Sequence, residues 1–171
     1  SYLKNSSFKF FGSIQSVVDN FIFENNTMLN SYKWWDLSVT GDNSFLFNNT
    51  LRNGSGGIAI HGSNSYMGSN NFLDFQFNLS YPNSYSKRGE GLITLTNLSS
   101  NNTITNNLFK NLEDIHAINI LSSDDNLISN NNFTDSGQGW HTIRDRSGYR
   151  NNYNNNTFDR CAGDEFMTVP W

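Results

Sequence analysis

A recurring pair of asparagines is the feature of this sequence that most constrains its fold. The repeated phrase runs from Asn or Asp through a short apolar stretch to an Asn pair, one further residue and an apolar anchor. The anchors are Phe8, Met28, Leu51, Phe72, Phe109, Phe133 and Phe158. Successive anchors are 20 to 25 residues apart, except for one step of 37 residues. A period of this length predicts repeated units that stack on one another.

A second apolar segment, with period-two alternation, lies between the anchors. Its clearest copies are Leu37–Val39, Ile58–Ile60, Ile93–Leu95 and Ile118–Ile120. Each repeat therefore supplies two or three short strands, and no repeat contains a helical stretch long enough for a βαβ crossover. We expect an all-β solenoid of about six to seven coils, in which neighbouring coils pair as parallel strands about 4.8 Å apart.

Composition agrees with a folded chain that contains little helix. The 171 residues include 30 Asn and 22 Ser, and Asn side chains compete with helical geometry by bonding to nearby backbone. Aromatic residues make up 15% of the chain, which is enough for a core and more than a disordered chain usually carries. We expect a single domain over residues 1–171, either a mature product or a piece of a longer solenoid.

The Asn pair has a physical reason at a sharp corner between strands. A residue at such a corner often adopts the left-handed conformation, which Asn tolerates better than other non-glycine residues. An inward Asn can bond to the backbone of its own turn and to the equivalent Asn in the coils above and below. We therefore predict an Asn ladder that satisfies buried turn groups, each of which would otherwise cost about 1–3 kcal/mol. The apolar anchors should stack inside it as a column.

Two copies of the phrase, over residues 102–109 and 126–133, resemble the repeat of right-handed parallel β-helix proteins of the pectate-lyase-like superfamily. In their Asn-rich composition the repeats are most similar to NosD-like repeats and to adhesin-like surface proteins of methanogenic archaea. The resemblance covers nearly all of residues 14–160 and implies a single-stranded right-handed parallel β-helix. It says little about function, because this superfamily includes lyases, glycoside hydrolases, epimerases, phage tailspikes and non-catalytic surface proteins.

Aromatic residues give the sequence a candidate carbohydrate-binding face. Trp34 and Trp35 precede one alternating strand and Trp140 precedes another, so the same corner of two coils should carry these rings. The long step between anchors contains an inserted loop over residues 79–91, and such loops on solenoids often line binding faces. This loop adds Tyr81 and Tyr85. The alternative is that the rings pack against the coil flank and the loop is a tolerated insertion.

Charged residues give a weaker candidate for a catalytic site. If Ile58 and Ile60 point inward, then His61, Thr94, Asn119 and Arg144 point outward, and Asp145 and Arg146 join the same polar face. The inserted loop adds Lys87, Arg88 and Glu90. Hydrolases need paired carboxylates, and uronate lyases need a base and a positive charge. No catalytic motif of the superfamily matches residue by residue, so no catalytic role is carried over, and the alternative is a solvated face.

Nine Asn-X-Ser/Thr sequons suggest glycosylation, although a chain with 30 Asn yields about six by chance. Several of these sequons fall in the Asn corner, where we expect an inward side chain that cannot carry a glycan. Asn53, Asn78 and Asn97 lie elsewhere and are the better candidates.

Other site classes find little support in the sequence. Asp124-Asp125 and Asp164-Glu165 have oxygen ligands for calcium but no EF-hand spacing, so we expect turn residues and no cofactor. The single cysteine, Cys161, forms no internal disulfide, and no His and Cys spacing resembles a zinc site. No apolar run is long enough to span a membrane. The net charge of −4 argues against non-specific nucleic-acid binding.

These features together lead to one functional expectation and one alternative. We expect an extracellular or cell-surface module with a structural or adhesive role, whose partner is a polysaccharide or a cell-surface glycan. Open coil ends would also allow a homo-oligomer or filament, because an unpaired strand edge is a template for pairing. The alternative is a polysaccharide lyase or glycoside hydrolase on the same fold.

Overall fold

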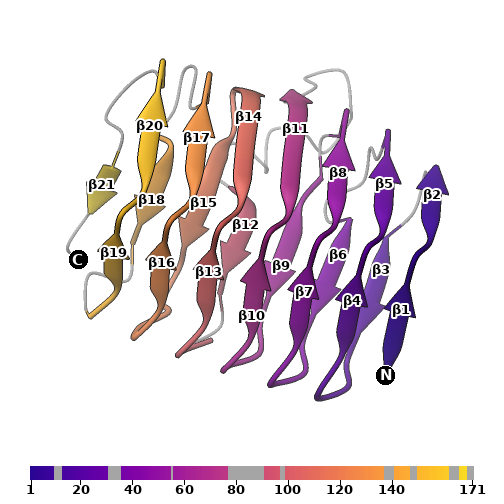
Figure 1. Ribbon diagram of the computed structural model, residues 1–171. Helices are drawn as coiled ribbons and strands as arrows, with labels where there is room; N and C mark the ends of the chain where they lie inside the picture. The colour runs from indigo at the N-terminus through magenta and orange to yellow at the C-terminus, as the bar shows by residue number, and fades with distance from the viewer. Residues whose placement is uncertain are drawn as a thin grey trace, which may run out of the picture.

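The computed structural model describes residues 1–9, 13–30, 36–54, 56–76, 91–96, 99–136, 141–146, 150–161 and 166–168. Within these ranges the secondary structure is entirely strands and turns, and no helix is long and apolar enough to cross a membrane. The strands form three parallel sheets of seven strands each (Figure 1). The expected all-β parallel solenoid is confirmed.

Each coil contributes one strand to each sheet, in the order first, second, third. The first sheet contains β1 (Tyr2–Lys4), β4 (Ile22–Glu24), β7 (Phe45–Phe47), β10 (Tyr66–Gly68), β13 (Thr103–Thr105), β16 (Leu127–Ser129) and β19 (Asn152–Asn154). The second contains β2 (Ser7–Lys9), β5 (Thr27–Leu29), β8 (Thr50–Arg52), β11 (Asn71–Gln76), β14 (Leu108–Glu113), β17 (Asn132–Thr134) and β20 (Thr157–Asp159). The third contains β3 (Ile14–Ser16), β6 (Leu37–Val39), β9 (Ile58–Ile60), β12 (Gly91–Leu95), β15 (His116–Ile120), β18 (Ile143–Asp145) and β21 (Phe166–Thr168).

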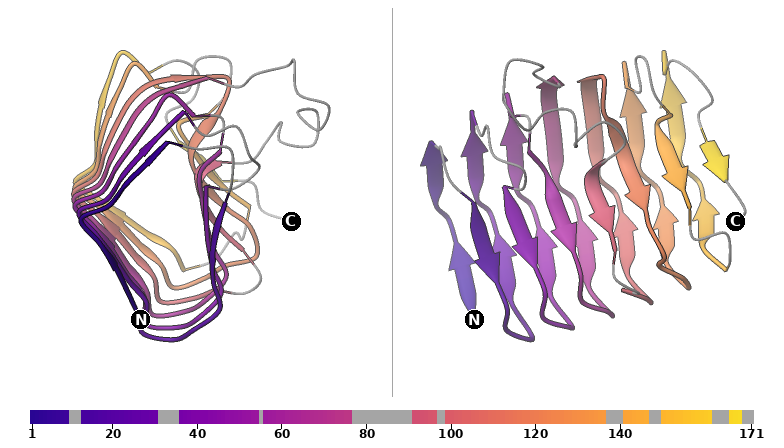
Figure 2. Two further views of the ribbon diagram at one scale, coloured as in Figure 1. Left: turned by 90° about the vertical axis from the view of Figure 1, so that its right-hand side faces the viewer. Right: turned by 180° about the vertical axis from the view of Figure 1, so that it is seen from behind.

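The coil is right-handed. Seen from the N-terminal end, the chain runs clockwise through the first, second and third sheets as it recedes from the viewer (Figure 2, left). We call the bend from the third to the first sheet the first corner, the bend from the first to the second sheet the second corner, and the bend from the second to the third sheet the third corner.

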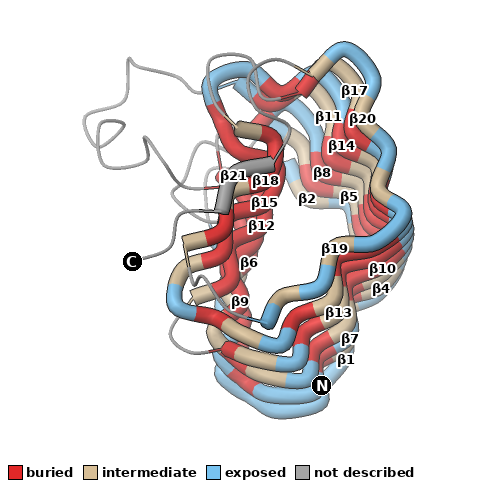
Figure 3. Tube along the Cα trace, turned by 90° about the vertical axis from the view of Figure 1, so that its left-hand side faces the viewer, coloured by how far each residue is buried: buried red, intermediate tan, exposed pale blue. Residues whose placement is uncertain are grey.

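The predicted apolar anchors form one column inside the second sheet. Strand pairing places them in unbroken register from Phe8 to Phe158. The rings of Phe72, Phe109, Phe133 and Phe158 stack with centroids 4.8 to 5.0 Å apart. The alternating segments form a matching column in the third sheet, and the buried positions line up from coil to coil in Figure 3. The interior is therefore a stack of identical layers.

The Asn ladder is confirmed at the second corner. Its members, each the second residue of an Asn pair or its equivalent, are Asn26, Asn49, Asn70, Asn107, Asn131 and Asn156. The side-chain oxygen of each later member accepts the backbone N–H of the preceding member at 2.8 to 3.0 Å. Each side-chain amide donates to a backbone carbonyl of the preceding coil at 2.8 to 3.0 Å. The expected bond to the backbone of the same turn is thus replaced by a bond to the neighbouring coil.

The two residues of each pair have different roles. The first has a positive φ, between 51° and 55° at Asn25, Asn48, Asn106, Asn130 and Asn155, and is exposed. The second turns inward and joins the ladder. Asn serves both positions because it tolerates the left-handed backbone in the first and both donates and accepts in the second.

The ladder makes a prediction about stability. Asn107→Ala removes the acceptor of two buried donors, the backbone N–H and the side-chain amide of Asn70, and it also leaves the Met67 carbonyl without its amide donor. We expect the free energy of unfolding to fall by about 2–4 kcal/mol in urea denaturation, because buried unpaired groups cost about 1–3 kcal/mol each. Asn106→Gly is the matched control, since the residue is exposed and glycine accepts its φ of 55°. Equal losses in the two variants would contradict a special role for the ladder.

Candidate functional site

The third corner carries a file of polar and charged side chains. In the coils whose third corner the structure describes, the residue that follows the three paired positions of the second sheet turns with a φ between 49° and 58°. These residues are Asn30, Asn53, Asp74, Asn111, Asp135 and Arg160. Asn and Asp are the residues that best accept this backbone, so the turn itself selects for amides and carboxylates. Stacking then brings them together along the corner.

Members of this file bond across the coils to one another and to Arg52, the residue before Asn53. Asp74 accepts from the guanidinium of Arg52 at 2.7 Å through one oxygen and from the amide of Asn111 at 2.7 Å through the other. Arg160 donates to both oxygens of Asp135, at 2.7 and 3.0 Å. These pairs are partly exposed, and pairs of this kind contribute only about 0–1 kcal/mol each to stability.

The same contacts fix the charge of both carboxylates. The hydrogen bond from Asn111 and the neighbouring Arg52 lower the pKa of Asp74 below its ordinary value. The hydrogen bond from Arg160 lowers the pKa of Asp135 in the same way. Asp74 and Asp135 are therefore both ionised at neutral pH.

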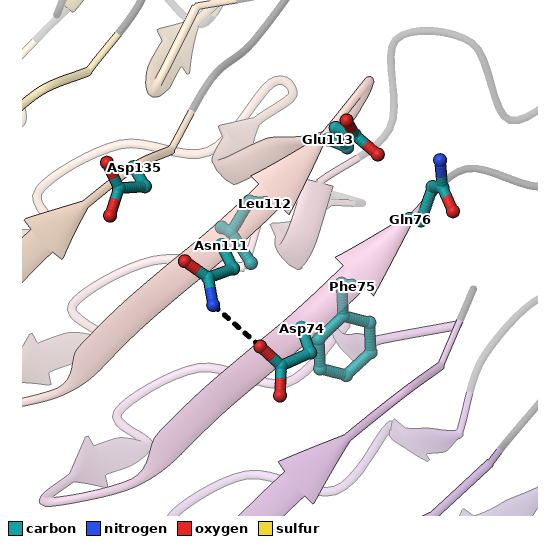
Figure 4. Close-up of a pocket in the computed structure, with 7 residues that line it drawn as sticks. All are labelled: Asp74, Phe75, Gln76, Asn111, Leu112, Glu113 and Asp135. Carbon is teal, nitrogen blue, oxygen red and sulfur yellow. Dashed lines mark hydrogen bonds between the residues drawn. The ribbon is translucent and has the colours of Figure 1, made fainter.

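A groove of about 400 Å³ runs beside this file. It is lined by Asp74, Phe75, Gln76, Asn111, Leu112, Glu113 and Asp135 (Figure 4). β11 and β14 are six residues long, whereas their neighbours β8 and β17 have three, so the longer strands carry Gln76 and Glu113 beyond the corner in register with each other. Phe75 and Leu112 are buried beneath them. The groove thus has an apolar floor and a rim of carboxylates and amides.

Most of the residues proposed from the sequence as a carbohydrate or catalytic site lie outside the described residues. They are Trp34, Trp35, Tyr81, Tyr85, Lys87, Arg88, Glu90 and Trp140. The same holds for two of the proposed glycosylation sites, Asn78 and Asn97. Their roles stay predictions.

The described members of the proposed catalytic face do not converge. His61 follows β9 and Arg144 lies in β18, three strand steps away, which corresponds to about 14 Å. Placing Asp145 on the polar face was wrong. This residue occupies the inward column of Ile60 and Ile120, is 2% exposed, and accepts from the Tyr153 hydroxyl at 2.6 Å.

The outer face of the third sheet also differs from the expected exposed polar strip. Thr94 and Asn119 were expected to be exposed, but both are buried, as is Ala59 between Ile58 and Ile60. Thr94 bonds through its hydroxyl to the backbone of Gly91. Alternation gives the direction of a side chain and not its accessibility, which depends on what packs over the sheet.

The exclusion of corner sequons from glycosylation was also wrong. Where a pair at the second corner is part of a sequon, the sequon asparagine is the first member, as in Asn25, Asn48 and Asn155, and all three are exposed. The inward residue is the second member, which is not the glycan acceptor. Asn53, a preferred candidate, is exposed as well.

No group of three or more His, Cys, Asp or Glu side chains suited to a metal ion occurs within the described ranges. Asp125, considered as a calcium ligand, turns at the first corner with a φ of 57° and receives two bonds from Arg150 at 2.8 Å. The expected role as a turn residue is confirmed for Asp125, whereas Asp164 and Glu165 lie outside the described residues.

No family model, curated protein or solved structure matches this chain.

The groove residues were missed from the sequence although a signal existed. Asp74, Asn111, Asp135 and Arg160 each lie two residues after an apolar anchor. Polar residues at a fixed offset from the anchors are the sequence signal that indicates this file.

His116 of the third sheet is a buried titratable group with a consequence for stability. His116 is fully buried, its ring stacks on that of His141 at 6.0 Å, and its Nδ1–H donates to the His141 carbonyl oxygen at 2.6 Å. Burial lowers the pKa of His116 to about 4, although the hydrogen bond to the His141 carbonyl oxygen acts in the opposite direction. The folded protein therefore keeps this imidazole neutral where an unfolded chain would protonate it.

We expect stability to fall as the pH drops from about 6.5 to about 4. In this window the unfolded chain binds a proton at His116 and the native protein does not, which lowers the free energy of unfolding by about 3 kcal/mol in total. Urea denaturation over this range measures the decrease, and His116→Gln should remove most of it. A variant that retains the full decrease would assign the effect to other groups.

Proposed function

We propose that this protein is a non-catalytic β-solenoid module that binds a neutral polysaccharide along the groove of the third corner. The observation that carries the proposal is the file of Asp74, Asn111 and Asp135 on three successive coils, beside a groove of about 400 Å³. Carboxylates accept and amides both donate and accept, so together they complement the hydroxyl groups of a sugar chain. A groove that crosses stacked strands suits an extended polymer.

Charge narrows the class of polymer. Asp74 and Asp135 are ionised at neutral pH, and Glu113 adds a third acidic side chain to the rim. Arg52 and Arg160 are already paired with Asp74 and Asp135, so they offer a polyuronate little attraction, while Glu113 would repel its carboxylates. A neutral polysaccharide meets no such penalty.

The same two carboxylates disfavour the alternative of a glycoside hydrolase at this groove. Asp74 and Asp135 are two strand steps apart, about 10 Å, which is near the upper end of the spacing that inverting enzymes use. Such an enzyme needs one carboxyl group with a raised pKa to act as the general acid. Both pKa values are lowered instead, so neither group is suited to donate a proton at neutral pH.

An extracellular or cell-surface location and an adhesive role form part of this proposal. They are supported by the exposed corner sequons and by a stacked fold that presents the same surface repeatedly along its length. Labelling intact cells of the source with an antibody to the chain tests the location. Signal that appears only after the cells are permeabilised would contradict it.

Binding at the groove is tested with the exposed residues at its far end. We expect Gln76→Ala combined with Glu113→Ala to weaken binding to hydroxyethyl cellulose about tenfold in affinity electrophoresis, equivalent to about 1.4 kcal/mol. Asn152→Ala on β19 is the matched control, because this side chain is exposed and lies on another sheet. Polygalacturonate should bind neither the native chain nor the variants. Retention by polygalacturonate, or release of reducing ends from either polymer, would contradict the proposal.

End-to-end assembly is a second proposal, and the register of the second sheet supports it. Lys9 on the first strand of this sheet and Asp159 on the last belong to one column. A second copy stacked head to tail would bring opposite charges together within about one strand spacing of 4.8 Å. The hydroxyl of Ser6 would then face the backbone N–H of Asn156 in the other copy. A serine hydroxyl already accepts such a bond inside the stack, where Ser65 accepts from the backbone N–H of Ser44 at 3.1 Å.

Charge reversal tests this assembly. We expect Lys9→Glu and Asp159→Lys each to raise the protein concentration at which filaments appear by about two- to fivefold in electron microscopy at low salt, because an exposed pair contributes about 0.2–1 kcal/mol. The double variant should restore the native value. Lys110→Glu, in the middle of the same column, is the control. Monomers at all concentrations of the native chain would refute the assembly.

A further inference from the structure

The outer face of the first sheet carries large apolar side chains that the core does not use. The first residue of each strand points outward, while the second points into the core. Along the stack these outward residues are Tyr2, Ile22, Phe45, Tyr66, Thr103, Leu127 and Asn152. Phe45 is 44% exposed, although burying a phenylalanine side chain contributes about 1.5–3 kcal/mol. An exposed ring beside further rings is a candidate contact surface.

Three aromatic rings and one glycine form a compact cluster on β7 and β10, which we call the aromatic platform. It consists of Phe45, Phe47 and Tyr66 together with Gly68. Phe45 is paired with Tyr66 and Phe47 with Gly68 across the two strands. The rings of Phe45 and Tyr66 lie 6.3 Å apart at an angle of 37°.

Gly68 determines how the tyrosine lies. A Cβ atom built on this residue would lie 2.6 Å from two ring carbons of Tyr66, and it would lie even nearer to the hydroxyl oxygen of Tyr66. The ring therefore lies along its own strand, over Gly68, instead of projecting away from the sheet. Gly68 is buried on an outward position for this reason. The missing side chain makes room for a ring that lies along the sheet surface.

Polar groups border the platform at both ends along the stack. Thr103 and Thr105 of β13 pair with Tyr66 and Gly68, and the Thr105 hydroxyl accepts from Ser129 at 3.1 Å. On the other side Ile22 pairs with Phe45, while Glu24 pairs with Phe47 and forms an ion pair with Lys4. The surface therefore offers apolar faces in the centre and hydroxyl and carboxylate groups around them.

The size of the platform distinguishes between two kinds of occupant. A large aromatic side chain buries about 150–250 Å² when it is covered completely. Phe47 and Tyr66 are already half-buried, so the three rings together supply less than the roughly 800 Å² per partner of a stable protein interface. A ligand with a small apolar face and a polar periphery fits this surface better than a second protein.

We propose that the aromatic platform is a second carbohydrate-binding site, which stacks the apolar C–H face of a pyranose unit on Phe45 and Tyr66. The hydroxyl groups at the edge of the sugar meet Thr103 on one side and Glu24 on the other. This site lies on the first sheet, whereas the groove lies at the third corner, so each can bind independently of the other. Two sites on different faces of one solenoid can join two polysaccharide chains.

The platform is tested by the fraction of chain retained on amorphous cellulose and on chitin, two insoluble polymers of pyranose units. We expect the native chain to bind at least one of them. In the background of the groove variant, Gln76→Ala with Glu113→Ala, which weakens retention through the groove, Phe45→Ala combined with Tyr66→Ala should weaken binding about tenfold. Gly68→Ala in the same background should also weaken it although every ring is retained, because the added methyl displaces Tyr66. Leu127→Ala, in the same outward column, is the matched control and should change binding less than about twofold.

The groove variant, Gln76→Ala with Glu113→Ala, separates the failure of this site from the failure of the groove. Unchanged retention of the Phe45 and Tyr66 variant, or no binding of the native chain to either polymer, would overturn the platform. If the platform variant binds normally while the groove variant loses hydroxyethyl cellulose, the groove stands without the platform. If only the platform variant loses binding, the platform stands without the groove. Each variant should unfold cooperatively above the temperature of the binding assay, which shows that lost binding reflects the altered surface and not an unfolded chain.

Discussion

The hydrogen-bond ladder at the second corner is the interaction on which the rest of this protein depends. Each inward asparagine is held by the coil before it and the coil after it, so a shift of one coil would break bonds on both sides. The ladder continues unchanged across the 37-residue step, where Asn70 bonds to Asn107 at 2.9 and 3.0 Å. An insertion can therefore enter one repeat without disturbing the register of the next coil. The stacked phenylalanines beside the ladder follow from the same register.

Fixed register also explains how this fold builds surfaces. A residue at a given offset in the repeat becomes one member of a file along the stack, at intervals of about 4.8 Å. At the third corner the file contains Asp74, Asn111 and Asp135, because the left-handed turn selects short polar side chains. On the first sheet the file contains Phe45 and Tyr66, because that outward position places no limit on side-chain size. The groove and the aromatic platform are two products of one geometric rule.

Sequence patterns identified some of these residues and missed others for physical reasons. The inward and outward columns of the third sheet followed from alternation, and Ile58, Ile93 and Ile118 lie in one column as expected. Asp145 was assigned to the wrong face because its charge was given more weight than its position, while a hydrogen bond from Tyr153 makes an inward carboxylate acceptable. The lengths of β11 and β14, which extend the groove, depend on pairing between two distant segments and leave no local signal.

The sequence by itself determined the coil, the parallel pairing and the ladder, because each depends on a residue type that recurs at a fixed period. The period alone places Asn49 beside Asn70 and Phe109 beside Phe133. The tertiary structure alone decided which polar side chains are accessible, which carboxylates stay ionised, and how Tyr66 lies over Gly68. These properties depend on contacts between neighbouring coils and on what covers each face. A repeat specifies where a residue stands in the stack, and its neighbours across the stack determine what that residue can bind.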